Sequence, residues 1–309
     1  MRNGSSTLDH WLRPRTIDEA SRLAGEDGAI LIAGGCELVG RLGRTAGQFS
    51  TLVDLQKVTE FEPLYAHPKK GLRIGALTTI RQASNNLWLA KRWAALHEAA
   101  EQFSSPQASN TATVVGNICA GDPRYDMATA LLAHRANVQL YRNSGISAVG
   151  LSEFYRGLAR PDLRHGNIVT GISAPPPEPD AGSAFRRIQL MQRRPSDMTS
   201  LAAAACVALD PAGKTIREAA VAVRACTRGP LRAIAVEIEL IGMPAVTETF
   251  ERAGQIAADS RPVPSNLDPA EHYKQRLVLS LVRDVIEQAV SRARSKHNPF
   301  EDATDLLRQ

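Results

Sequence analysis

The chain has 309 residues, of which 43% are hydrophobic and 22% are charged, a composition that fits a globular protein of about two domains. No run of about 18 uncharged apolar residues occurs, which excludes a membrane-spanning helix and predicts no membrane span. The net charge of +5 is spread along the chain and aromatic residues make up only 5%, so we expect no nucleic-acid binding.

The cysteines and the first residues indicate a cellular compartment. The four cysteines are far apart and none forms a C-x-x-C pair, which argues against zinc and iron–sulfur sites in this chain. The N-terminus lacks the apolar run of a secretory signal. Reduced cysteines without an export signal predict a cytoplasmic protein.

The first part of the chain is predicted to alternate short strands and helices. The first ten residues are expected to be disordered, and the capping box Thr16-Ile17-Asp18-Glu19 predicts a helix that ends at about Leu23. Apolar runs and alternating patterns predict strands over residues 29–32, 51–54 and 72–75. A second capping box, Thr79-Ile80-Arg81-Gln82, begins another helix.

This pattern continues as far as a proline-rich run. Apolar residues at helical spacing predict one long helix over 87–103, and further patterns predict a helix over 127–133 and strands over 138–141 and 167–172. The run from Pro175 to Pro179 cannot hold a sheet ladder or a helix interior. We therefore place the main domain boundary there, which gives a first domain over residues 1–177.

The second domain, over residues 183–296, is predicted to contain three strands and then three helices. The expected strands cover residues 184–191, 201–209 and 216–225, and the helices cover residues 233–240, 246–258 and 271–294. A polar tail follows over residues 297–309. The predicted fold class is α+β, with a small three-stranded antiparallel sheet and C-terminal helices.

The first segment with chemical potential is Ile30 to Leu38, where a predicted strand runs into Gly34-Gly35. Glycine has no Cβ, so a phosphate group can approach the backbone and accept hydrogen bonds from successive N–H groups. A plain tight turn is the alternative interpretation. The segment lacks G-x-G-x-x-G, so a nicotinamide-binding Rossmann turn is not predicted.

The second segment runs from Thr111 to Asp126. Backbone donors and the Thr113 hydroxyl could hold a diphosphate, and the Asn117 amide could both donate and accept hydrogen bonds. Asp126 could accept hydrogen bonds from ribityl or ribose hydroxyls. The alternative is that Asp126 caps the helix that begins at Met127.

Together, residues 33–38, 113–118 and 122–126 resemble motifs of the FAD-binding medium subunit of the xanthine dehydrogenase / carbon monoxide dehydrogenase family of molybdenum hydroxylases. Residues 72–79 and 182–187 resemble further segments of that family, and the likeness extends from Trp11 to Ala293. The resemblance implies a PCMH-type FAD-binding domain of two α/β subdomains over residues 1–177, a C-terminal medium-subunit domain over residues 183–296, and a tail over residues 297–309.

The chain departs from the family pattern at several positions. Val115 stands in place of the first glycine of a pair, Cys36 in place of a threonine, and Asp122 in place of a serine. The family's lysine at the start of the C-terminal domain is replaced by Arg187, or by Arg186 in a shifted register. An arginine keeps the positive charge but offers a planar fork of donors.

The resemblance also implies a set of cofactor-binding residues. Phe103 would stack beside the isoalloxazine ring, although a core aromatic at a helix end is the alternative, and Val169 would be an apolar contact. Cys119 aligns with cysteines of a subfamily that carries an extra iron–sulfur cluster, but the other cysteines are missing, so we predict no cluster. The implied cofactor-binding residues are Leu31, Ile32, Ala33, Gly34, Gly35, Cys36, Glu37, Leu38, Phe103, Thr113, Val115, Gly116, Asn117, Asp126, Val169 and Arg187.

The implied function is that of a non-covalent FAD-carrying electron-transfer subunit with no catalytic residue for the organic substrate. It would pass electrons from [2Fe–2S] clusters of a small partner subunit to an external acceptor, beside a molybdopterin-binding large subunit, in a dimer of heterotrimers. One alternative is a stand-alone flavin-dependent oxidase of the vanillyl-alcohol-oxidase type, which is disfavoured because no histidine lies in either motif. The other is a scaffold subunit without flavin.

Overall fold

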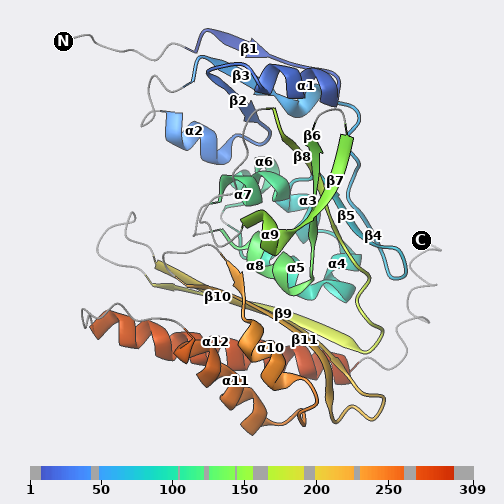
Figure 1. The fold of residues 1–309 in the computed structure, drawn as a ribbon, viewed down its shortest axis with the longest axis vertical. Coiled ribbons are helices and arrows are strands. Elements are labelled where there is room, and N and C mark those ends of the chain that lie inside the picture. Colours follow the sequence, from blue (N-terminus) through green and yellow to red (C-terminus); the bar gives the residue numbers. More distant parts are fainter. Residues whose placement is uncertain are drawn as a thin grey trace.

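The computed structural model describes residues 8–42, 49–103, 105–121, 125–142, 145–155, 166–190, 199–225, 230–260 and 269–295. Within these ranges, three β-sheets follow one another along the long axis of the molecule (Figure 1). None of the helices in the described ranges has the length and apolar character needed to cross a membrane.

The first sheet is parallel, with the strand order β1-β3-β2. Its strands are β1 (His10–Leu12), β2 (Ala29–Ile32) and β3 (Thr51–Asp54), with helices α1 (Ile17–Ala24) and α2 (Cys36–Leu42). Thr16 caps α1 by accepting a hydrogen bond from the N–H of Glu19, as the sequence predicts. The expected disorder of the first ten residues is wrong at His10, which begins β1. Its residues are mostly exposed, so no apolar pattern marks it.

The second sheet has five antiparallel strands in the order β4-β5-β8-β6-β7. The strands are β4 (Tyr65–His67), β5 (Gly71–Gly75), β6 (Asn137–Arg142), β7 (Gly145–Gly150) and β8 (Ile168–Ala174). Its associated helices are α3 (Ile80–Ser84), α4 (Leu87–Arg92), α5 (Ala94–Glu101), α6 (Pro106–Thr111), α7 (Val114–Ala120), α8 (Met127–Ala133) and α9 (Leu151–Tyr155).

The long helix expected over residues 87–103 is two helices. The chain breaks between α4 and α5 at Trp93, whose backbone has φ −121° and ψ 49° and is not helical. The Trp93 side chain is fully buried in the core, so an indole ring fills the interior at the break. Apolar periodicity continues through the break, which is why the sequence pattern does not reveal it.

The C-terminal domain contains a four-stranded antiparallel sheet, so the expected three-stranded sheet is wrong by one strand. The strands are β9 (Ala181–Leu190), β10 (Thr199–Leu209), β11 (Ile216–Ala225) and β12 (Leu231–Arg232), in the order β12-β11-β10-β9. Strand β12 has only two residues, which is too short for a periodic signal. Three helices follow, α10 (Ile234–Leu240), α11 (Thr247–Asp259) and α12 (Pro269–Arg294).

The four-stranded sheet is covered on both faces. Helix α12 packs on β9 and β10, while α5 and α8 of the preceding part pack on the same strands and on β11 (Figure 1). Phe185, Ala202, Ala204 and Ala222 of this sheet belong to the same buried cluster as Trp93. One apolar core therefore continues from the helices of the second sheet into the C-terminal domain.

Candidate cofactor-binding site

The two glycine-bearing segments of the sequence lie against each other. A Cβ added to Gly34 would lie 2.0 Å from the carbonyl oxygen of Thr111, at the end of α6. Nearby, the Cys36 Sγ lies 3.1 Å from the Thr111 Oγ1. Gly34 is thus required by the close approach of the two segments, which leaves no space for any side chain.

The first loop then enters α2 through Gly35. Gly35 has φ +73°, a left-handed conformation that side-chain-bearing residues rarely adopt. The Gln56 side chain holds the start of this loop, because its Nε2 donates a hydrogen bond to the Ala33 carbonyl at 3.3 Å. The first turn of α2 leaves backbone N–H groups without intrahelical acceptors, as every helix does.

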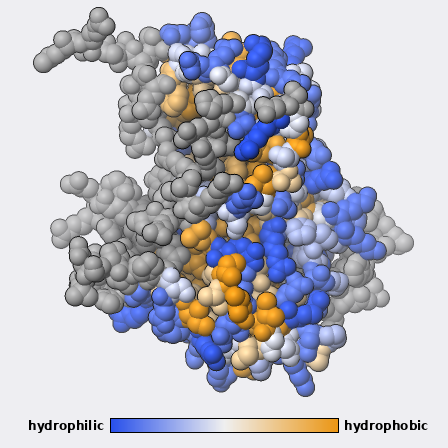
Figure 2. Space-filling model, viewed as in Figure 1, coloured by the Kyte–Doolittle hydropathy of each residue, from blue (hydrophilic) through white to orange (hydrophobic). Residues whose placement is uncertain are grey.

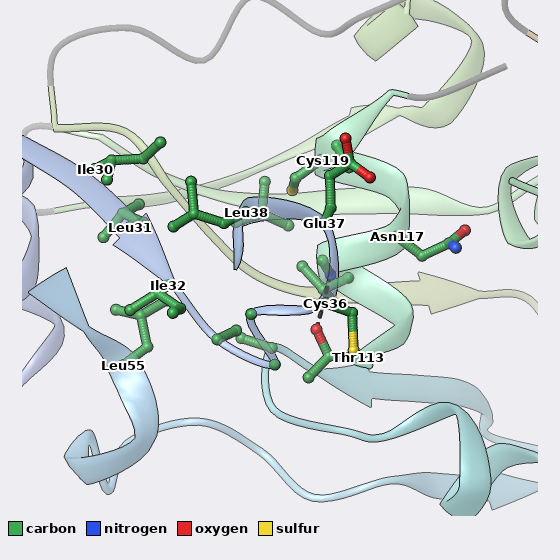
Figure 3. A pocket seen from close by; sticks show the side chains of 18 of the residues that line it. Ile30, Leu31, Ile32, Cys36, Glu37, Leu38, Leu55, Thr113, Asn117 and Cys119 are labelled. Atoms are coloured by element: carbon green, nitrogen blue, oxygen red, sulfur yellow. Dashed lines mark hydrogen bonds between the residues drawn. The ribbon is translucent and has the colours of Figure 1, made fainter. Parts of the chain in front are cut away.

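The second loop is fixed by the cap of α7. The Thr113 Oγ1 accepts a hydrogen bond from the Gly116 N–H at 2.9 Å, drawn as a dashed line in Figure 3. A Cβ on Gly116 would lie 2.6 Å from that oxygen. The backbone also pairs with the preceding segment, since the Val114 N–H donates to the Thr78 carbonyl at 3.0 Å. Gly116 thus keeps the Thr113 cap free of steric conflict.

A cavity of about 410 Å³ lies between these loops, within the range of small-molecule sites. Side chains from β2, α2 and α7 surround it (Figure 3). Every predicted cofactor-binding residue except Asp126 and Arg187 lines it. Residues that sequence reasoning did not select also line it, namely Ala24, Ala29, Ile30, Leu55, Ala76, Ala112, Cys119, Ala120, Tyr125, Gly166, Asn167 and Ile168. Four of them, Ile30, Ala112, Tyr125 and Ile168, directly neighbour a predicted residue in the chain, and this proximity is the signal that could have found them.

The walls of the cavity combine aliphatic side chains with a few polar groups. Ile30, Leu31 and Leu55 form an apolar side, as Figure 3 shows. The Tyr125 hydroxyl donates a hydrogen bond to Glu37 and so connects the segment after α7 with α2. In the part of the chain that the structure describes, no three His, Cys, Asp or Glu side chains gather as a metal site requires.

Cys119 contributes a neutral thiol to the cavity wall. Burial raises the pKa of this thiol to about 12, because a thiolate would lose its hydration there. The thiol is therefore protonated at neutral pH and behaves as a small apolar group. Phe103 lines the cavity and also packs against the core, and its stacking on a flavin ring stays a prediction.

Asn117 carries an unsatisfied polar atom at this site. The residue is buried, lines the cavity, and its Oδ1 has no hydrogen-bond partner among the described residues. Figure 3 shows its amide extending away from Leu38 and the aliphatic wall. Buried polar side-chain atoms in proteins nearly always have a partner. The Oδ1 is closed off from the cavity as well as from solvent, so it is an unsatisfied buried acceptor beside the cavity.

Asp126 and Arg187 lie outside the residues that line the cavity. The Arg187 Nη1 contacts the Asp126 Oδ2 at 2.8 Å, and the fully buried Arg224 pairs with the other carboxylate oxygen. Arg187 also donates a hydrogen bond to the Gln102 carbonyl. Asp126 directly precedes α8, yet its side chain makes no capping bond among the described residues. The structure thus places both residues in an ion-pair cluster between α8 and the C-terminal sheet.

Comparison with known families identifies the chain. Residues 5–177 match the FAD binding domain in molybdopterin dehydrogenase, and residues 186–289 match the CO dehydrogenase flavoprotein C-terminal domain. The chain belongs to the FAD-binding medium subunits of the xanthine and CO dehydrogenase family of molybdenum hydroxylases. This medium subunit is therefore an oxidoreductase subunit and a flavoprotein.

Individual relatives are similar to this medium subunit over nearly its whole length. It is 27% identical to the nicotinate dehydrogenase FAD-subunit of Eubacterium barkeri, covering 90% of this chain and 96% of the relative. It is 26% identical to the carbon monoxide dehydrogenase medium chain of Afipia carboxidovorans, covering 92% and 97%. Its fold matches carbon monoxide dehydrogenase from Hydrogenophaga pseudoflava with a TM-score of 0.81 at 24% identity, covering 92% of this chain and 97% of that chain.

Proposed function

We propose that the cavity between the two loops holds FAD without a covalent bond. The observation that supports this most directly is the meeting of both glycine-bearing loops around a cavity whose lining combines aliphatic side chains with the polar side chains of Glu37, Thr113 and Tyr125. The aliphatic wall of Ile30, Leu31 and Leu55 suits an apolar ring or its dimethyl edge. Bound FAD supplies the chemistry of accepting and releasing electrons.

The residues of this chain would then hold and shield the cofactor. We expect the backbone N–H groups of Gly34 and Gly35 to donate hydrogen bonds to anionic oxygens. Thr113 can still donate its hydroxyl hydrogen, because the cap uses this oxygen only as an acceptor. We assign the cofactor-binding domain to residues 1–177, the C-terminal domain to residues 183–296 and the tail to residues 297–309.

We further propose that the subunit passes electrons from [2Fe–2S] clusters of a small partner to an external acceptor, next to a molybdopterin-binding large subunit in a dimer of heterotrimers. Support for partners comes from an apolar surface on the C-terminal domain. The exposed side chains that form it are Leu231, Ile234, Ile238, Ile241 and Val246. Figure 2 shows hydrophobic residues gathered over the region of α10. Exposed apolar patches of this kind mark interaction sites.

The apolar surface can be tested separately from the flavin site. Ile238 is 71% exposed, so Ile238→Asp is expected to leave folding and flavin content unchanged. It should reduce co-purification of the subunit with its complex by about tenfold, because a buried unpaired carboxylate is costly at an interface. Ile146→Asp, on the exposed strand β7, is the matched control. Equal recovery of the complex with both variants would contradict a role for this surface.

Cofactor extraction tests the main proposal. The purified subunit should release FAD on denaturation, measured by absorbance and by chromatography against an FAD standard. Asn117→Leu, which keeps the size of the side chain, should lower the bound fraction about tenfold while far-UV circular dichroism stays unchanged. Asn110→Leu, at an exposed position in α6, should retain flavin. A folded subunit without extractable FAD would instead support the scaffold alternative, and turnover of substrate by the isolated chain would support a stand-alone oxidase.

A further inference from the structure

Two aromatic residues that line the cavity lie next to residues that one arginine of the C-terminal domain holds. Phe103 and Tyr125 are these lining residues. Arg187 is not among the lining residues, yet its Nη2 donates to the Gln102 carbonyl at 2.5 Å and its Nη1 donates to the Asp126 Oδ2 at 2.8 Å. Gln102 directly precedes Phe103, and Asp126 directly follows Tyr125. The guanidinium therefore holds the chain one residue away from each aromatic side chain.

The strand register beneath this cluster brings two arginines to the same carboxylate. Arg187 on β9 and Arg224 on β11 both lie opposite Ala202 on β10, so the three residues form one row on one face of the sheet. Ala202 is fully buried and carries only a methyl group, so the two long side chains can converge across it. Both of them pair with Asp126. Arg224 therefore keeps Asp126 in an ion pair even if Arg187 is replaced.

The neighbouring Arg186 has different contacts, because successive strand residues point to opposite faces of a sheet. Its Nη1 lies 3.5 Å from the Asp284 Oδ2 on α12, and its side chain is 53% exposed. Arg187 shares the other face with Phe185, which belongs to the buried cluster that contains helices α5 and α8. The two arginines that the sequence leaves interchangeable are thus distinct, since Arg187 reaches residues beside the cavity and Arg186 reaches α12.

The bond to Gln102 orients the peptide unit that leads into Phe103. A peptide unit is planar, so holding its carbonyl oxygen and its N–H sets the orientation of the whole unit. Arg187 binds the oxygen, and the Phe103 N–H donates to the Ala100 carbonyl at 3.3 Å. Helix α5 ends at Glu101, so these two bonds set the direction in which the chain enters Phe103.

The bond to Asp126 holds the other aromatic residue. Asp126 directly precedes α8, and its carboxylate is held by Arg187 and Arg224. Tyr125 lies one residue earlier, and its hydroxyl donates to Glu37 on α2. The position of Tyr125 is therefore set at its backbone by the ion-pair cluster and at its hydroxyl by α2.

We propose that Arg187 is a positioning residue of the flavin cavity, which holds Phe103 and Tyr125 in place from the C-terminal domain without touching the cofactor. This inference rests on the proposed binding of FAD in the cavity. The guanidinium suits this role because its planar fork of donors holds two acceptors in a fixed arrangement, whereas a lysine offers a single charged centre. The C-terminal domain thereby shapes a site whose described lining residues all come from the first 177 residues.

Variants of Arg187 in the full-length subunit test the proposal. Arg187→Met removes both hydrogen bonds, and the fold should survive because Arg224 still pairs with Asp126. The visible circular dichroism of bound FAD, which depends on the groups around the flavin ring, should change. Flavin release in stopped-flow fluorescence should be about tenfold faster, as expected for loss of charge-assisted hydrogen bonds. Arg186→Met is the matched control and should behave like the wild type in both measurements.

A double-mutant cycle distinguishes positioning from a general loss of stability. In a subunit that already carries Phe103→Leu and Tyr125→Leu, Arg187→Met should change the release rate by no more than about twofold, because the side chains that it positions are absent. A further tenfold acceleration in that background would overturn the proposal, since Arg187 would then act by another route.

The remaining outcomes separate this inference from the proposed function. A folded wild-type subunit without FAD would overturn both, whereas flavin-loaded Arg187→Met with wild-type dichroism and release rate would overturn this inference alone. Arg187→Lys keeps a charge for Asp126 but lacks the fork, so its release rate should fall between those of the wild type and Arg187→Met. If Arg187→Met does not fold, wild-type dichroism and release rate in Arg187→Lys would overturn the proposal.

Discussion

The molecule contains two junctions that are built in opposite ways. Between the first and second sheets, glycine-bearing loops and aliphatic side chains enclose a cavity of about 410 Å³. Between α8 and the C-terminal sheet, Asp126 pairs with Arg187 and Arg224 and fills the junction. The first junction leaves space that a ligand can occupy, and the second is closed by charged side chains that pair with one another.

Residues of one sequence motif lie in two different places, some at the cavity and one in the ion-pair cluster between the domains. Thr113, Val115, Gly116 and Asn117 of the second motif line the cavity. Its carboxylate, Asp126, instead contributes to the interdomain ion-pair cluster. A residue that is close in sequence to a cavity-lining loop can therefore serve the packing of a neighbouring domain.

The largest expected effect is on the stability of the junction between α8 and the C-terminal sheet, where Asp126 pairs with Arg187 and Arg224. Asp126→Ala should lower the free energy of unfolding by about 3–5 kcal/mol, because it leaves the buried Arg224 without its carboxylate. Asp180→Ala, which removes one partner of the exposed Arg217, should cost at most about 1 kcal/mol. Urea denaturation measures both values. Loss of flavin from Asp126→Ala without loss of stability would place Asp126 at the cofactor and break the comparison.

At the junction that contains the cavity, Gly34→Ala should lower both stability and flavin affinity. The new Cβ would overlap the Thr111 carbonyl and force the loops apart, at a cost of about 1–3 kcal/mol and about tenfold in flavin affinity. Gly40→Ala is the matched control, because a Cβ there meets no atom within 4 Å. That control should be stabilised by about 0.5–1 kcal/mol, since alanine favours a helix. Equal flavin content in the two variants would show that the loops do not form the site.

A smaller effect is expected from Tyr125→Phe, which removes the hydrogen bond to Glu37 across the cavity. The loss should be about 1 kcal/mol, seen as a several-fold faster release of flavin in stopped-flow fluorescence. Tyr65→Phe changes an exposed ring on β4 that stacks on His67, and it should leave the release rate unchanged. An unaltered rate in Tyr125→Phe would mean that this contact does not close the site.

The last effect is absent at neutral pH and appears only as the pH becomes alkaline. The folded thiol of Cys119 has a pKa of about 12, above the value of about 8.5 for an unfolded cysteine. The folded state thus holds this proton more tightly, so its contribution to stability is complete below about pH 8.5 and is lost as the pH rises toward 12. Denaturation curves of the wild type and Cys119→Ala, compared from neutral to alkaline pH, should diverge. Parallel curves would indicate a hydrated cavity wall.

The sequence predicts local elements better than it predicts where side chains are used. The helix over 127–133 and the strands at 29–32 and 51–54 are confirmed, because their apolar patterns and flanking residues carry the signal. The break at Trp93 and the two-residue strand β12 leave no such signal. The pairing of Asp126 with Arg224, 98 positions away in the chain, depends on how the domains pack, which no local pattern encodes.

The apolar core that runs from Trp93 to Phe185 and Ala222 has a consequence for how this subunit can be divided. A chain shortened at the proline run would present α5 and α8 with bare apolar faces, and the remaining piece would expose one side of its sheet. Neither half would be a self-sufficient folding unit. Exchanging the C-terminal half between members of the family should therefore succeed only when the faces of α5 and α8 are exchanged with it.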